Sequence, residues 1–80
     1  MTMKLSELIT SLEIVKSYYD DPDGYHVGAE HDQIYLYVTD RPLSASHVQL
    51  MLDMGWFQEG GATEDDPSAY DPEESWMSFT

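Results

Sequence analysis

Residues 24–40, GYHVGAEHDQIYLYVTD, predict an antiparallel β-hairpin. In the second half of this stretch Ile34, Leu36 and Val38 alternate with tyrosine and threonine residues, which is the period of a half-buried strand. The segment AEHDQI before this strand is typical of a turn. We therefore expect two short strands joined by a tight loop, with one apolar face and one polar and aromatic face.

The register of this hairpin follows from the alternation, because inward-facing side chains must lie opposite one another. A loop with an even number of residues satisfies this condition, whereas an odd number does not. The inner face then holds three pairs: Ala29 with Ile34, Val27 with Leu36, and Tyr25 with Val38. The outer face holds His26 opposite Tyr37 and Gly28 opposite Tyr35. A tyrosine ring on this face covers the gap at the glycine.

Two helices are predicted, one on each side of the hairpin. Apolar residues recur at helical spacing over residues 5–19, with Ser6 as a candidate N-cap. Pro22 cannot continue this helix, so the chain must turn before the hairpin. A second helix is expected to begin after Ser44, its candidate N-cap, and to end at Gly55.

Residues 56–58 and 76–79 are short apolar and aromatic segments, which we predict to be a third and a fourth strand. Between them, residues 59–75 form an acidic segment that contains Gly and Pro. Hairpin loops are commonly about two to five residues long, so this longer connection is either a functional loop or disordered.

The sequence therefore predicts one α+β domain over residues 1–80, with the element order α-β-β-α-β-β. Both helices are expected to cover one face of an antiparallel sheet, which leaves the other face in water. The expected core consists of Leu8, Leu12 and Val48 from the helices and Val27, Ala29, Ile34, Leu36 and Val38 from the hairpin.

The charge of the chain is far from balanced. Sixteen Asp and Glu residues stand against 3 Lys and Arg residues, which gives a formal net charge of -13. Such a chain repels nucleic acid and anionic membranes and is attracted to basic surfaces. Selection for solubility alone would lead to a net charge of about 2 to 8 in magnitude. Because 41% of the residues are hydrophobic, the chain is expected to fold, and the excess of acids indicates a basic partner.

The sequence also predicts the compartment. It has no cysteine, which excludes a disulfide framework and suits a reducing environment. It lacks the run of about 18 apolar residues that a membrane span needs, and its first residues are not those of an export signal. We therefore expect a cytoplasmic protein.

Three histidines among many carboxylates call for a test of metal binding. His26 and His31 are separated by five positions along an extended chain, which places them on the order of 15 Å apart, too far for one ion. His47 lies on the second predicted helix. An EF-hand spacing is partly matched by Asp21, Asp23, Gly24 and Glu30. Tyr19 at its first position supplies no carboxylate, and a strand follows instead of a helix, so we expect no metal and no cofactor.

Catalytic motifs are absent from the sequence. It contains no GxSxG, no Gly-rich phosphate loop and no HExxH, and no nucleophile is placed beside a base. Ser6 and Ser44 are explained as helix caps. We therefore expect no enzymatic activity, and a small metal-dependent enzyme stays as a third class only because of the histidines.

The carboxylates gather in three groups, which we predict to bind the partner. They are Asp20, Asp21 and Asp23 in the first turn, Glu30 and Asp32 at the hairpin tip, and Glu64, Asp65, Asp66, Asp71, Glu73 and Glu74 in the acidic segment. The first two groups are expected to contribute more, because ordering a mobile loop costs entropy. Tyr35 and Tyr37 are an alternative docking surface, although cross-strand packing explains them equally well.

Residues 29–36 (AEHDQIYL), the helix ending in Met54, Gly55 and Trp56, and the closing residues 76–79 resemble the small, acidic proteins of phages and prophages. The resemblance spans most of the chain, which carries an insertion at residues 60–72. It implies a non-enzymatic inhibitor that binds a host defence protein, such as an anti-CRISPR that mimics DNA and binds a CRISPR-Cas subunit. The alternative is an antitoxin-like or assembly module that binds through the face of Tyr35 and Tyr37.

Overall fold

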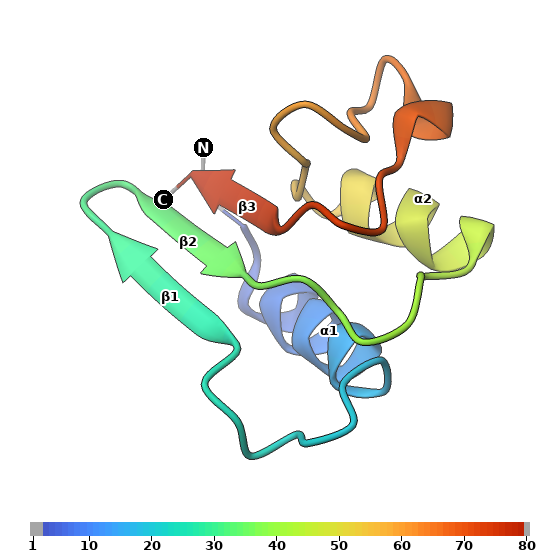
Figure 1. Cartoon of the computed structure of the whole chain (residues 1–80). Coiled ribbons are helices and arrows are strands. Elements are labelled where there is room, and N and C mark those ends of the chain that lie inside the picture. Colours follow the sequence, from blue (N-terminus) through green and yellow to red (C-terminus); the bar gives the residue numbers. More distant parts are fainter. Residues whose placement is uncertain (1–2, 80) are drawn as a thin grey trace.

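A computed structural model describes residues 3–79 and contains two α-helices and one antiparallel sheet (Figure 1). In chain order the elements are α1 (Leu5–Lys16), β1 (Val27–Glu30), β2 (Gln33–Leu36), α2 (Ala45–Asp53), the 3-10 helix η1 (Pro67–Ala69) and β3 (Trp76–Phe79). The strands lie in the order β1-β2-β3. The predicted α+β class is confirmed, with the order α-β-β-α-β. None of the helices within residues 3–79 has the length and apolar character needed to cross a membrane.

The register predicted for the hairpin is confirmed. Val27 pairs with Leu36 and Ala29 with Ile34, so the loop between the strands has two residues. His31 in this loop has a φ of 28°, in the left-handed region that tight hairpin turns require. The ladder begins only at Val27, and the predicted pairing of residues 25 and 38 is not part of it.

The helix ends were predicted in part. Ser44 caps α2, because its side chain accepts a hydrogen bond from the N–H of His47 at 3.3 Å. Gly55 ends α2 with a φ of 102°. The prediction for Ser6 was wrong: the N-cap of α1 is Lys4, whose N–H donates to the Glu7 carboxylate at 3.0 Å.

The core lies over β2 and β3. The side chains that are at most 1% exposed include Leu36, Met51, Leu52, Trp56 and Trp76. Leu36 and Val48 were predicted correctly, and Leu8, Leu12 and Ile34 pack against the core while partly buried. The prediction was wrong for Val27, Ala29 and Val38, which are exposed, because β1 and the chain after β2 extend beyond the region that the helices and the two tryptophans fill.

Residues 56–58 do not form the predicted third strand. Phe57 makes a single bridge with Met77, with N···O distances of 2.9 and 2.8 Å. The pairing does not continue beyond this bridge, because the chain turns back on itself: the N–H of Gln58 donates to the carbonyl of Ala62 and that of Gly61 to the carbonyl of Gln58, at 2.9 and 3.2 Å. The four-strand order was therefore wrong, and the bridge instead covers the outer edge of β3.

One buried side chain fixes the path of residues 59–75. The Gln58 amide is 1% exposed, and its Nε2 donates to the carbonyls of Asp71 and Glu74 at 2.8 and 3.2 Å. Its Oε1 accepts from the N–H groups of Ala62 and Asp71 at 3.0 and 2.9 Å. The acidic segment is thus held at three points along its backbone and packs beside α2 through η1.

Candidate partner-binding surface

One side of the sheet, which points away from Leu36 and Trp76, carries exposed aromatic side chains. We call this side the outer face. Tyr37 and Phe79 are 51% and 44% exposed. Phe79 lies beside Phe57, with ring centroids 5.4 Å apart. Tyr35, on the same face by strand alternation, is half-buried. The sequence analysis predicted Tyr35 and Tyr37 on this face, and in the structure Phe57 and Phe79 enlarge the aromatic surface.

A tyrosine covers the glycine of β1, as expected. The nearest side chain is that of Tyr37, because a Cβ built on Gly28 would lie 2.8 Å from the Tyr37 Oη. The closest atom of Tyr35 would lie at 3.8 Å. The diagonal neighbour therefore fills this gap more tightly than the directly opposed one.

The electrostatic environment of Tyr35, at the centre of the outer face, is negative. The Tyr35 hydroxyl donates to Gln33 Oε1 at 2.5 Å. Partial desolvation raises the pKa of Tyr35, and the negative charges of Glu30, Glu59 and Asp32 raise it further. Glu30 and Asp32 lie at the hairpin tip next to Tyr35 on the adjoining strand, and Glu59 follows Phe57, which bridges β3. Glu59 was missed by sequence reasoning, and its place directly after the strand predicted at residues 56–58 was the available signal.

His26 does not lie on the outer face, so that prediction was wrong. Its ring stacks on Tyr19, with centroids 3.9 Å apart and planes inclined by 6°, and its Nε2 is 2.5 Å from the Asp21 carbonyl oxygen. The strand ladder begins one residue later, so nothing forces His26 to continue the alternation. His26 thus packs the residues before β1 against the turn that follows α1.

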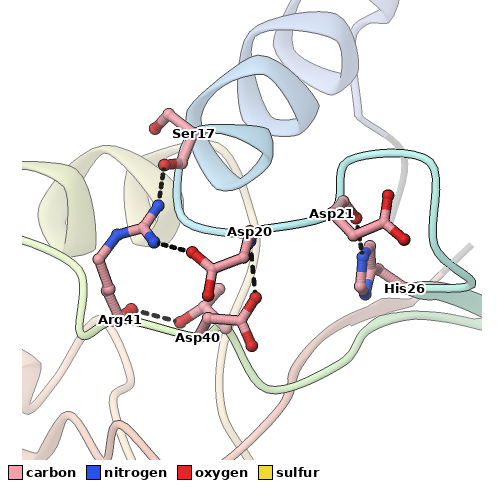
Figure 2. A network of polar contacts seen from close by, with 7 residues as sticks. Ser17, Asp20, Asp21, His26, Asp40 and Arg41 are labelled. Atoms are coloured by element: carbon pink, nitrogen blue, oxygen red, sulfur yellow. Dashed lines mark hydrogen bonds and ion pairs between the residues drawn. The ribbon is translucent and has the colours of Figure 1, made fainter.

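The first-turn acids have structural contacts of their own (Figure 2). Arg41 pairs with Asp20, and its second terminal nitrogen donates to the Ser17 carbonyl at 2.6 Å. The N–H of Asp20 donates to Asp40 Oδ2 at 2.7 Å. These contacts tie the end of α1 to the chain after β2, so Asp20 is partly neutralised. The remaining two acids of this group, Asp21 and Asp23, are exposed.

The acids of the long segment divide by exposure. Those exposed are Glu64, Asp65, Asp66 and Glu73, and those half-buried are Asp71 and Glu74. The latter two are the residues whose backbone is bound by Gln58. Thus the long segment begins with the exposed Glu59, directly after Gln58, and carries its other exposed acids farther along the chain.

The charge of the molecule is almost entirely uncompensated within the fold. Between residues 3 and 79 the only ion pair is that of Arg41 with Asp20, whose side chains are 51% and 74% exposed. Exposed pairs of this kind contribute at most about 1 kcal/mol. The large negative field is therefore available to a partner.

The histidines do not assemble a metal site in the part of the chain that is described. That part holds no group of three His, Cys, Asp or Glu residues able to bind an ion. His47 Nδ1 is instead 2.7 Å from the Tyr18 hydroxyl, and His31 is exposed in the hairpin turn.

Comparison of the chain with protein-family models, curated proteins and solved structures gives no match.

Tyr19 is the titratable side chain most changed by folding. It is 6% exposed, and its hydroxyl donates to the Tyr37 carbonyl at 2.5 Å. Burial and, secondly, the negative charge of Asp40 raise the pKa of Tyr19 to about 12 from its ordinary value of 10.0.

Replacing Tyr19 with Phe is expected to change how stability depends on pH. Between pH 10 and 12 the unfolded wild-type chain loses the Tyr19 proton while the folded chain keeps it, so the free energy of unfolding falls as pH rises. The phenylalanine variant lacks this contribution. Urea titrations of both proteins should show a wild-type advantage that is constant below pH 10 and shrinks above it. A constant difference across the whole range would contradict the prediction.

Proposed function

We propose that this chain is a non-enzymatic binding protein that occupies a basic, nucleic-acid-binding surface of another protein. The observation that carries the proposal is its charge: 16 acidic residues on a folded scaffold, with one ion pair among residues 3–79. Duplex DNA presents one charge per ~1.7 Å of its axis, and a groove lined with Lys and Arg to hold it also accepts fixed carboxylates.

The outer face suits this role better than a purely acidic patch. A guanidinium group can stack on a tyrosine ring and pair with a carboxylate at the same time. Tyr35 with Glu30 and Glu59 offers both kinds of contact. The acidic and the aromatic surfaces were predicted separately, and our proposal is that they act together as one contact surface for the partner.

The resemblance to small phage proteins extends the proposal to an inhibitor of host defence, acting in the host cytoplasm. Its most specific version is an anti-CRISPR that binds a CRISPR-Cas subunit in place of DNA. The competing function is an antitoxin-like or assembly module that docks through the apolar parts of the outer face. Salt separates the two, because charge pairing weakens as salt rises whereas apolar contact does not.

The test begins with capture of the partner from a bacterial lysate and its identification by mass spectrometry. Affinity is then measured at low and high salt for two variants with equal charge change. The outer-face variant carries Glu30→Gln, Asp32→Asn and Glu59→Gln, and the matched control carries Glu64→Gln, Asp65→Asn and Glu73→Gln. We expect the outer-face variant to bind about tenfold more weakly than the control at low salt.

Two results would contradict the proposal. Equal losses of affinity in both variants would mean that only the total charge of the protein matters, and that the outer face is not part of the interface. An affinity that does not respond to salt would favour the apolar module.

A further inference from the structure

The two edges of the sheet are treated differently by the fold. Phe57 bridges Met77 and so covers the outer edge of β3. At the opposite edge of the sheet, no strand within residues 3–79 lies beyond β1 (Figure 1). Unpaired strand edges are templates for pairing with another chain.

The free hydrogen-bonding groups of β1 can be assigned from its register. The N–H of Tyr37 donates to the His26 carbonyl at 2.9 Å, which places this carbonyl on the side of the strand that faces β2, while the His26 N–H donates to the Gly24 carbonyl at 3.1 Å. Residues alternate along an antiparallel ladder, so Gly28 and Glu30 also bond to β2. The N–H and C=O groups of Val27 and Ala29 therefore point away from the sheet.

Beside this edge lies an apolar cavity of about 200 Å³. Its lining includes Leu12, Val15, Lys16 and Tyr19 on the side of α1 and Val27 on β1. Cavities of about 150 Å³ already accommodate a benzene-sized group, so this one has room for an apolar side chain. Leu5 and Ile9, which are 73% and 50% exposed, continue the helix face of Leu12 and Lys16 at helical spacing. We call this cavity with Leu5 and Ile9 the edge groove.

We infer that β1 and the edge groove bind an extended basic segment of the partner as an additional strand. Backbone groups of the segment would bond to Val27 and Ala29, and its apolar side chains would enter the edge groove. The basic character follows from charge: exposed acids stand at both ends of β1, Asp21 and Asp23 before it and Glu30 and Asp32 after it. Strand pairing brings alternate Lys or Arg side chains within reach of them.

A second copy of the chain is a poor occupant of the same edge. Two molecules of net charge -13 would meet with their acidic strand ends close together. Acids at the end of a short edge strand are also a known protection against self-pairing. The edge is therefore closed to self-association and open to a partner of opposite charge. This inference rests on the proposed function only in assigning the basic segment to the partner protein.

The test uses the full chain and a synthetic peptide in which Leu and Lys alternate over seven residues. Amide exchange and NMR titration should show saturable binding, with protection gained at the N–H groups of Val27 and Ala29. Those of Gly28 and Glu30, already bonded to β2, should change little. The same peptide methylated on alternate backbone nitrogens, and a Leu-Glu peptide, should each bind at least about tenfold more weakly. Absence of saturable binding, or equal binding of either control peptide, would overturn the inference.

Two protein variants locate the site. Val27→Lys places a like charge at the edge groove and should weaken peptide binding by about tenfold. Val38→Lys makes the same charge change at an equally apolar position of similar exposure, 45% against 54%, and should change it at most about twofold. Equal effects, or protection of Val27 and Ala29 in the isolated protein through dimer formation, would reject the basic strand as occupant. The peptide measurements use the isolated protein and need no captured partner, so failure of the proposed function would leave this result standing.

Discussion

Replacing Leu36 with Ala is expected to lower the free energy of unfolding by about 2 to 5 kcal/mol. Leu36 is fully buried at the centre of the sheet, where it pairs with Val27 on one side and Trp76 on the other. It also lines the cavity beside β1, so its removal enlarges an existing space that the core cannot easily close. Chemical denaturation monitored by tryptophan fluorescence measures the change.

Val38→Ala is the matched control for this substitution. Val38 follows β2 on the same side of the alternation and is 45% exposed, so its truncation should cost less than about 1 kcal/mol. A loss of less than about 1 kcal/mol for Leu36→Ala as well would mean that the core does not depend on the centre of β2.

Gln58→Leu is expected to destabilise the protein by about 3 kcal/mol. The substitution keeps the size of the side chain but removes the partner of four backbone groups, in Ala62, Asp71 and Glu74. Each buried group left without a partner costs about 1 to 3 kcal/mol, and the segment recovers part of this by opening to water. The loss should therefore appear in the stability curve and in faster amide exchange at Ala62 and Asp71.

The control for Gln58 is the exposed glutamine of α2. Gln49 donates to the Asp53 carboxylate at 2.9 Å on the helix surface, and Gln49→Leu should change stability by at most about 0.5 kcal/mol. Equal effects of the two substitutions, or unchanged exchange at Ala62, would contradict the role assigned to Gln58.

The parts of the fold that depend on local spacing could be predicted from the sequence. Side-chain parity sets the pairing of Val27 with Leu36, and local backbone chemistry sets the cap at Ser44 and the stop at Gly55. The third strand could not be predicted correctly. A glutamine at position 58 gives no local sign that its amide binds the backbone of residues far along the chain.

The exposure of side chains at the edge of the sheet also could not be predicted from the sequence. Val27 has the same apolar character as a core residue, and its exposure depends on how far the helices reach across the sheet. The candidate site was predicted in part for a similar reason. The charge and the two tyrosines are evident from composition and alternation, whereas the approach of Glu59 to Tyr35 depends on the bridge between Phe57 and Met77.

Gln58 holds its segment through main-chain atoms alone, and this has a consequence for how the protein can evolve. The side chains at positions 64, 65 and 69 are exposed and make none of the four anchoring bonds, so exchanges among residues that keep the backbone conformation leave these bonds in place. Mutations there can accumulate without loss of the scaffold. The segment can thus vary at these exposed positions, while Gln58 and the backbone path that it holds stay under constraint.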